Sequence, residues 1–332
     1  MTKEAPIAAL APVDPLATDA LTLTETLLTV RDWLRFCASS FEYGDRGEAL
    51  YLGHGTVSAW DESVALVLGA LHLPPDSGAE VLDARLLPDE REQIYTLIKR
   101  RVHERIPLPY LLGEAYFAGH LFKVDSRVLI PRSPIAELIN DGFAAWFPDR
   151  DPENLLDLCT GSGCIGIASA LALPTTNVTL ADISQDALAV AVENIRRFDL
   201  GNRVHAVQGD MFEALPRTSD SFAGYDLIVC NPPYVDARDI ANMPEEFRHE
   251  PELALASGAD GLDFTRKLLN EAAEYLSPDG ILIVEVGNSE RQLCEAYPEL
   301  PFVWLEFEQG GHGVFALTRE DLLMASSGTS YS

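Results

Sequence analysis

The run Asn231-Pro232-Pro233-Tyr234 carries the most specific chemistry in this sequence of 332 residues. It directly follows an apolar segment, 225–230, so we expect it at the end of a strand. The prolines predict a turn that leaves the Pro232 carbonyl outside regular structure and beside the Asn231 side chain. A planar NH2 group could donate one hydrogen to each of these acceptors while the Tyr234 ring covers its face. The run predicts a site for an amide or amino nitrogen, although a plain proline turn with a buried asparagine would look the same.

A glycine-rich loop earlier in the chain could hold a second molecule. Residues 160–166 carry the pattern GxGxxG between an apolar segment, 155–159, and a helical pattern, which lets the backbone approach a ligand closely. A structural turn or a nicotinamide dinucleotide site would show the same pattern. Asp182 ends the next apolar segment about twenty residues later, where a carboxylate can accept hydrogen bonds from both hydroxyls of a ribose. Asp182 could instead cap a helix together with Ser184.

Asp210 ends a third apolar segment and is followed by Met211 and Phe212. We expect its carboxylate near an adenine amino group, with the apolar side chains beside the ring. Taken singly, such a residue is a routine strand end. In an open α/β sheet, however, ligands bind at the carboxyl ends of the strands, and there Asp210 would converge with the glycine loop and Asp182.

The elements that must position these residues follow from the pattern after Leu155, where short apolar runs alternate with helical patterns. This alternation predicts an open, mostly parallel α/β sheet. Its expected strands are 155–159, 178–182, 204–208, 225–230, 281–286, 302–307 and 314–318. The link between the last two, 308–313, is too short for a helical crossover, so these strands should pair antiparallel at the end of the sheet.

The first hundred residues predict a small helical domain. Apolar residues recur at helical spacing from Leu23 to Phe41, and two further amphipathic stretches follow, at 61–71 and after Pro88. Aromatic and β-branched residues then alternate between 110 and 130, which indicates a hairpin-like linker. The length of the chain agrees with about two domains.

The composition limits the kinds of partner. Lysine and arginine number 24 against 52 aspartates and glutamates, so the formal net charge is −28. Proteins that bind a phosphate backbone need a positive surface, so we expect no stable binding to nucleic acid. A basic partner or a small ligand fits better. No apolar run reaches the roughly 18 residues of a membrane span and no signal peptide begins the chain, so we expect no membrane contact and a cytoplasmic location.

The metal-binding and redox residues form no pattern of their own. The five cysteines are scattered without a CxxC pair, and the seven histidines make no HxxxH or HExxH pair. We therefore expect free thiols and no metal site. The chemistry expected at residues 231–234 needs no metal.

The glycine loop, the two aspartates and the NPPY run, in this order, resemble the class I S-adenosylmethionine-dependent methyltransferases that modify planar nitrogens. The resemblance implies a Rossmann-like, seven-stranded methyltransferase sheet with S-adenosyl-L-methionine as cofactor and S-adenosyl-L-homocysteine as product. It implies a catalytic role for Asn231, Pro232 and Tyr234. The cofactor-binding residues that it implies are Asp157, Thr160, Gly161, Gly163, Asp182, Ile183, Asp210, Met211 and Asn231.

Segments outside this core narrow the resemblance. Residues 107–113 and 128–132 resemble the linker of the protein glutamine methyltransferases. Residues 132–137, 53–56 and 60–62 resemble the members that modify ribosomal protein L-three, uL3, whereas the release-factor enzymes carry Arg-Pro-Glu-Thr-Glu at the linker. The resemblance covers nearly all of 22–320. The organisation that we expect is a disordered N-terminus (1–20), a helical substrate-recognition domain (21–108), a β-hairpin linker (109–132), the S-adenosylmethionine-binding methyltransferase domain (133–320) and a disordered tail (321–332).

The resemblance implies methyl transfer to the side-chain amide nitrogen of a glutamine in ribosomal protein L-three. Because that partner must be basic to bind ribosomal RNA, the net charge of −28 leads us to expect that the enzyme meets it before ribosome assembly. One alternative substrate is a peptide chain release factor, and another is an adenine or guanine amino group in nucleic acid. The net charge argues against the nucleic acid. A third alternative is a non-catalytic assembly factor that binds a ribosomal protein, against which the intact run 231–234 argues.

Two charged segments are open to more than one interpretation. The loop from Val235 to Asp263 holds eight carboxylates and could face a basic substrate, although a merely solvated loop is nearly as good an explanation. The basic cluster Lys99, Arg100, Arg101 and Arg105 could contact RNA. It also lies at the C-terminus of an expected helix, where cations are favoured without any partner.

Overall fold

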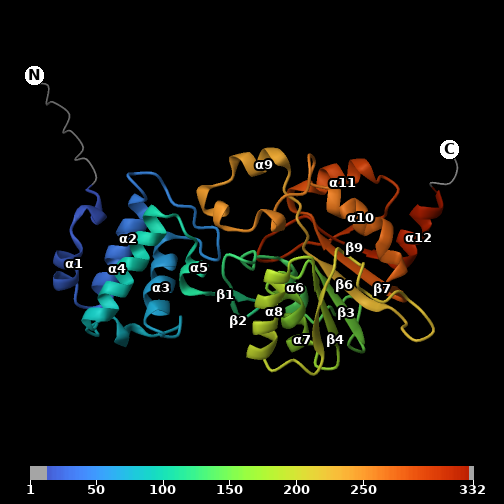
Figure 1. Cartoon of the computed structure of the whole chain (residues 1–332), viewed down its shortest axis with the longest axis horizontal. Helices are drawn as coiled ribbons and strands as arrows, with labels where there is room; N and C mark the ends of the chain where they lie inside the picture. Colours follow the sequence, from blue (N-terminus) through green and yellow to red (C-terminus); the bar gives the residue numbers. More distant parts are fainter. Residues whose placement is uncertain (1–12, 329–332) are drawn as a thin grey trace, which may run out of the picture. The chain divides into compact units, whose positions relative to one another are not determined.

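The computed structural model describes residues 13–328, which fall into two compact units with the boundary between Leu112 and Gly113 (Figure 1). The expectations for residues 1–12 and 329–332 lie outside the described residues. The first unit is helical and the second contains the sheet. No helix of the described part is long and apolar enough to cross a membrane.

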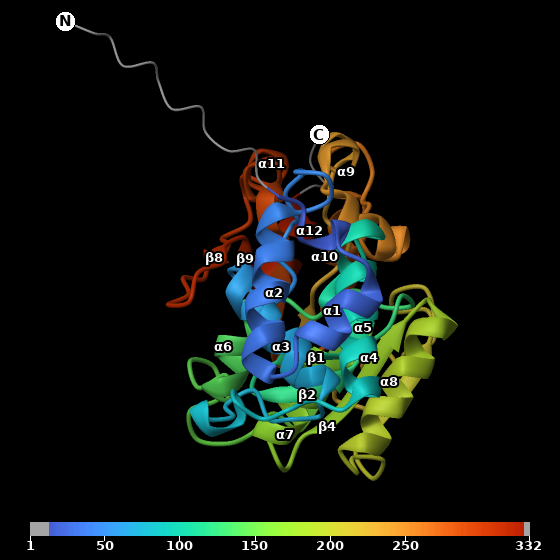
Figure 2. The same ribbon diagram turned by 90° about the vertical axis from the view of Figure 1, so that its left-hand side faces the viewer.

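The helical unit packs three main helices, α2, α3 and α4, around a core that includes Trp33, Leu66 and Ile98 (Figure 2). The single helix expected from Leu23 to Phe41 is two helices, because Thr29 and the side chain of Asp32 form a capping box that starts α2 afresh. Its elements are η1 (Pro15–Ala17), α1 (Ala20–Thr26), α2 (Val30–Tyr43), α3 (Ala59–Ala70), η2 (Ala79–Val81), α4 (Pro88–His103) and α5 (Leu108–Leu112).

The second unit opens with a short antiparallel hairpin, β1 (Glu114–Phe117) and β2 (His120–Lys123). The hairpin expected between 109 and 132 is therefore present but narrower. Its first residues, 109–112, instead belong to α5, where Pro109 is tolerated because the first helical turn needs no intrahelical N–H donors.

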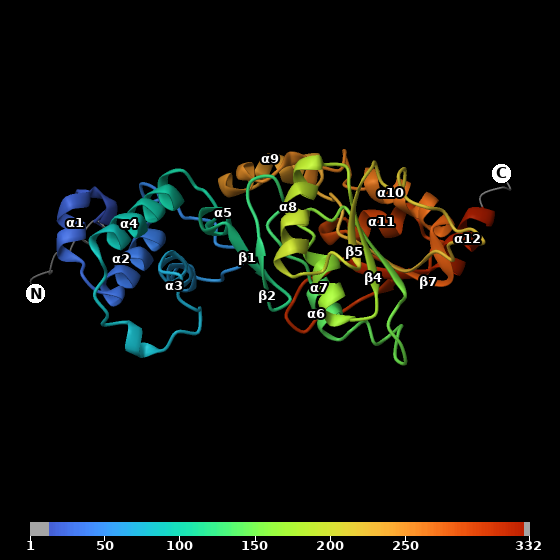
Figure 3. The ribbon, with the colours of Figure 1, turned by 60° about the horizontal axis from the view of Figure 1, so that its bottom comes forward.

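Seven strands form the main sheet in the order β5-β4-β3-β6-β7-β9-β8, which confirms the predicted fold class. Figure 3 shows β5 and β4 side by side in this sheet. The strands from β5 to β7 run parallel, and β9 pairs antiparallel with both β7 and β8, as the short link between the last two strands predicts. The strands are β3 (Asn154–Leu158), β4 (Asn177–Asp182), β5 (Val204–Gln208), β6 (Tyr225–Cys230), β7 (Leu276–Glu285), β8 (Val303–Trp304) and β9 (Val314–Thr318).

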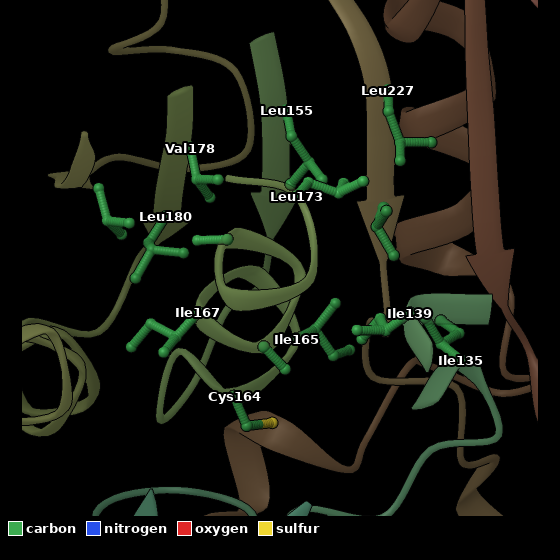
Figure 4. Close-up of a cluster of buried hydrophobic side chains, with 14 of the residues drawn as sticks. Ile135, Ile139, Leu155, Cys164, Ile165, Ile167, Leu173, Val178, Leu180 and Leu227 are labelled. Atoms are coloured by element: carbon green, nitrogen blue, oxygen red, sulfur yellow. The ribbon is translucent and has the colours of Figure 1, made fainter. Parts of the chain in front are cut away.

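Helices cover both faces of this sheet, because successive side chains of a strand point to opposite sides. Leu155 and Leu227 belong to a core with α6 (Ile135–Asn140), α7 (Cys164–Ala172) and α8 (Gln185–Arg197), part of which appears in Figure 4. Leu156 and Ile228 belong to the opposite core with α10 (Asp263–Glu271), α11 (Glu290–Ala296) and α12 (Arg319–Gly328). A long segment between β6 and α10 holds α9 (Ala237–Asn242), η3 (Glu245–His249) and η4 (Glu252–Ala254), and η5 (Ala272–Glu274) and η6 (Gly287–Ser289) flank β7.

Two expectations of disorder differ from the structure. Residues 321–328, expected in a disordered tail, belong to α12. Leu322 is 2% exposed there because it packs into the core beside α10, which stabilises the helix. At the other end, residues 13–20 include the short helix η1, with Leu16 against the helical core.

Candidate active site

The parallel strands bring the predicted residues to one edge of the sheet. In the register of the sheet, Leu158 at the end of β3 lies opposite Ala181 of β4 on one side and Cys230 of β6 on the other. Asp182 and Asn231 directly follow Ala181 and Cys230, and the glycine loop follows Leu158 after one further residue, Cys159. The structure therefore places the three predicted segments side by side at the carboxyl ends of the strands.

The turn from β3 into α7 depends on left-handed backbone. Gly163 has φ 80° and precedes the first residue of α7, a conformation in which a side chain would be strained. The turn aims the N–H of Gly166, in the first turn of the helix, at the Asp157 carboxylate on β3, 2.8 Å away. The loop is thus built around this carboxylate.

Asp157 is buried, with 1% of its surface exposed, and only part of its hydrogen-bonding capacity is used. Its Oδ2 accepts from the Thr160 hydroxyl and from the Gly166 N–H. Its Oδ1 is buried and has no partner among the described residues, and none of those residues forms an ion pair with it. Burial raises the pKa of Asp157 to about 7, because the charged form is poorly solvated there. The site therefore contains a buried acceptor that is ready for a donor.

Asp182 connects the glycine loop to the next helix. Its Oδ2 accepts from the Gly161 N–H and its Oδ1 from the Ser184 N–H, each at 2.9 Å. Burial raises the pKa of this carboxyl as well. Ser184 itself caps α8, so the capping interpretation holds for Ser184, while each Asp182 oxygen keeps a lone pair for a further donor. The neighbouring Ile183 is 50% exposed and offers an apolar surface next to that carboxylate.

In the third predicted segment, 210–212, the acidic side chain already has a partner and the apolar side chains are buried. Asp210 is half-exposed, and its Oδ2 lies 3.0 Å from the ammonium group of Lys267 on α10. Met211 has φ 51° and is 5% exposed, and Phe212 stacks on Tyr275 with ring centroids 4.3 Å apart. Both apolar side chains thus belong mainly to the core. The sequence did not indicate the lysine partner of Asp210.

The Asn231 side chain is left open at the end of β6. The residue is half-buried, and no described residue forms a hydrogen bond with its amide group, while Pro232 is buried beside it. Tyr234 is held differently, since its hydroxyl donates to Glu285 Oε1 over 3.0 Å. Burial and the nearby Glu285 raise the pKa of Tyr234, so the hydroxyl stays protonated.

Glu285 is the functional candidate that sequence reasoning missed. It ends β7, is 4% exposed, and accepts a second hydrogen bond from the Ser133 hydroxyl at 2.6 Å. Burial raises its pKa to about 7, although the hydrogen bonds from Ser133 and Tyr234 and the charge of Arg132 act in the opposite direction. An acidic residue inside the apolar run 281–286 was the signal that could have identified it.

The acidic loop, residues 235–263, does not expose all of its carboxylates to solvent. Glu250 is 5% exposed and forms a bidentate ion pair with Arg132, with distances of 2.7 and 2.9 Å. The Arg132 guanidinium also lies over the Phe247 ring, 5.0 Å from its centroid. Glu246 is buried as well, so two of the eight carboxylates do not face solvent.

The basic cluster of the helical unit is likewise not a continuous surface. Arg101 is 1% exposed, pairs with Glu62, and donates to the Tyr51 carbonyl at 2.6 Å. Arg105 donates to the Ala49 carbonyl at 2.9 Å. Arg101 is therefore not part of a basic surface, because its side chain neutralises a buried carboxylate.

No group of three or more potential metal ligands occurs within the described residues, and the five cysteines are free thiols.

A family model described as the methyltransferase small domain matches residues 142–259. The ribosomal protein uL3 glutamine methyltransferase of Bordetella pertussis is 48% identical over 301 residues, which cover 90% of this chain and 97% of that protein. The chain belongs to the uL3 glutamine methyltransferase family. The enzyme of the same name from Francisella tularensis is 46% identical, over 91% of this chain and 93% of that protein.

Membership in the uL3 glutamine methyltransferase family confirms the resemblance drawn from the NPPY run and the linker segments. Among solved structures, a methyltransferase from Pyrococcus furiosus is 16% identical, covers 70% of this chain and 99% of its own, and has a TM-score of 0.42. The relatives and the family model show that the chain is a methyltransferase.

Proposed function

We propose that this protein transfers a methyl group from S-adenosyl-L-methionine to the side-chain amide nitrogen of a glutamine in ribosomal protein uL3. The observation that carries the proposal is the match, over about nine-tenths of the chain, to relatives named for this activity. The open amide of Asn231 beside Pro232 supports it, because a glutamine side chain ends in the planar NH2 group that these acceptors suit.

The residues at the glycine loop fit S-adenosylmethionine, which supplies a methyl group activated by its sulfonium centre. Asp157 Oδ1, buried and without a partner among the described residues, is suited to accept from an ammonium group. Asp182 would accept from the ribose hydroxyls and Ile183 would contact the adenine. The loop would approach the cofactor through Thr160, Gly161 and Gly163. Asp210 and Met211 would lie at the edge of the adenine, where both the adenine and Lys267 would contact the Asp210 carboxylate.

Asn231 and Pro232 supply alignment and polarisation. An amide nitrogen is a poor nucleophile, since its lone pair is delocalised into the carbonyl group. Two acceptors that each bind one of its hydrogens fix the position of the nitrogen. Such positioning can lower the activation barrier by up to about 7 to 11 kcal/mol in favourable systems. Positive charge grows on the nitrogen during transfer, and the same acceptors stabilise it until the proton is lost to solvent.

The charge of the chain supports a basic protein substrate. At a net charge of −28, the enzyme attracts a free ribosomal protein and is repelled by RNA-covered particles. We therefore expect free uL3 in the cytoplasm, before assembly, to be the better substrate.

The test is to incubate the enzyme with labelled S-adenosylmethionine and purified uL3, and to locate the methyl group by mass spectrometry. A single methylated glutamine is expected. Asn231→Ala should reduce methyl transfer about 100-fold or more with cofactor affinity within a few-fold, the scale of one lost electrostatic stabiliser. Asn202→Ala, at an exposed turn residue, is the control. A methyl group on a release factor or a nucleobase instead would refute the substrate assignment.

A further inference from the structure

We propose that Glu285 is a positioning residue for methyl transfer, which holds Tyr234 and, through it, the turn Asn231–Tyr234. The inference rests on the proposed function, because the reaction is its main readout. Among the described residues Glu285 forms hydrogen bonds with Tyr234 and Ser133 and not with Asn231 or Pro232, so its role is to fix Tyr234.

The sheet brings Glu285 to this turn. Strand β7 pairs in parallel with β6, with Val284 opposite Cys230, so Glu285 stands beside the first residue of the NPPY run. Its two oxygens are each used once. Oε1 accepts from the Tyr234 hydroxyl at 3.0 Å and Oε2 from the Ser133 hydroxyl at 2.6 Å. A carboxylate that is 4% exposed with both oxygens engaged is anchored and does not swing between partners.

Tyr234 is held from two further sides. A Cβ atom at Gly287 would lie 2.6 Å from Cε2 of the tyrosine ring, so only glycine lets the ring lie so close to the backbone after β7. The Ser289 hydroxyl donates to the Tyr234 carbonyl at 3.0 Å. The hydroxyl, the ring and the carbonyl of Tyr234 thus all contact residues 285–289, and Glu285 provides the link at the far end of the side chain.

The charges around Glu285 favour this arrangement. Arg132, one residue before Ser133, pairs with Glu250 at 2.7 Å and places positive charge near both Glu285 and Tyr234. Since the Tyr234 hydroxyl donates to Glu285, it is not a donor for the substrate, and what Tyr234 offers is the orientation of its ring. A displaced ring would displace the turn that carries both acceptors.

The kinetic test compares Glu285→Gln, Tyr234→Phe and the double variant. If Glu285 acts through Tyr234, each single variant lowers kcat about 10-fold, leaves KM for S-adenosylmethionine within about two-fold, and the double variant loses no more than the worse single one. Asp279→Asn, which neutralises an exposed carboxylate of the same strand, is the matched control. Wild-type kcat in Glu285→Gln, or losses that multiply in the double variant, would overturn the proposal.

A second readout needs no substrate. The Val235 amide, next to Tyr234, donates to the Leu255 carbonyl at 2.9 Å and should be protected from hydrogen exchange. Glu285→Gln and Tyr234→Phe are both expected to raise exchange in the peptide around 231–236 at least several-fold, whereas Asp279→Asn is not. Unchanged exchange in both variants would overturn the proposal even if uL3 were not the substrate. An inactive wild-type enzyme with increased exchange in the variants would refute only the proposed function.

Discussion

Glu62 in the helical unit and Asp157 in the second unit are both buried carboxylates, but their hydrogen-bond partners differ in kind. Glu62 in the helical unit is 2% exposed, and Arg101 and the Thr56 hydroxyl engage its two oxygens. Asp157 in the methyltransferase unit is 1% exposed, receives only neutral donors on one oxygen, and has no partner for the other among the described residues.

The difference supports the proposal that Asp157 binds the cofactor, whereas Glu62 serves only the fold. A buried charge is costly to desolvate unless it is paired, so a carboxylate that serves only the fold is expected to be neutralised inside the protein, as Glu62 is. Burial raises the pKa of Asp157 to about 7, and an acceptor without a partner among the described residues has no benefit for the free protein. The open acceptor is what we expect of the proposed binding site, whereas the ion pair of Glu62 with Arg101 links α3 to α4.

The largest effect is expected from breaking the ion pair of Glu62 with Arg101. Arg101→Met leaves Glu62 charged and buried, and should destabilise the helical unit by about 3 to 5 kcal/mol in urea unfolding. The double variant Arg101→Met with Glu62→Leu should recover much of this loss, because the uncompensated charge is gone. A loss below about 1 kcal/mol in the single variant would contradict the structural role of the pair.

The pH dependence of stability tests two buried carboxylates of the second unit, Asp157 and Glu285, next. Burial raises the pKa of Asp157 and of Glu285 to about 7 in the folded protein, above their values in the unfolded chain. Between about pH 4.5 and 7 the folded state then binds more protons, so stability falls as pH rises and is steady above that window. Glu285→Gln should remove its share of this fall, at most about 3 kcal/mol. Parallel pH profiles of the wild type and the variant would contradict this.

Asp157→Asn tests the open acceptor directly. The asparagine oxygen can still accept from Thr160 and Gly166, but an NH2 group replaces the open oxygen. We expect folding stability within about 1 kcal/mol of wild type and S-adenosylmethionine affinity weaker by about 1 to 3 kcal/mol, measured by calorimetry. The exposed Asp186 on α8 gives the control variant Asp186→Asn. Unchanged affinity would mean that the open oxygen has no role in binding.

The smallest effect concerns charges that face solvent. Glu245 has a side chain that is 55% exposed and lies 3.7 Å from Arg248, whereas the next residue, Glu246, is buried. Steering of a basic substrate should depend only on the first. Glu245→Gln is expected to lower kcat/KM for uL3 by about two-fold or less at low salt. The difference between the variant and the wild type should vanish near about 0.2 M salt, because the Debye length shortens as salt is added. A salt-independent rate would refute steering.

The parts of the fold that were predictable are those with local causes. Apolar runs of strand length alternating with helical patterns identify the sheet and its antiparallel end, because each strand must bury both faces between helices. The terminal helix α12 was missed, since its stability comes from Leu322 in a distant core and not from a strong local pattern. The break before α2 was also missed, because the hydrophobic spacing continues across the cap at Thr29.

The sequence by itself determined the glycine loop, Asp182 and the NPPY turn as the candidate site, because each is a short motif whose backbone geometry follows from its own residues. Only the tertiary structure decided which oxygens are open and which are used. Glu285 meets Ser133 from 152 residues away and Tyr234 from 51, and Arg101 meets Glu62 from 39. Such pairings depend on how strands and helices pack, and no local pattern of residue types encodes which distant partner will neutralise a buried charge.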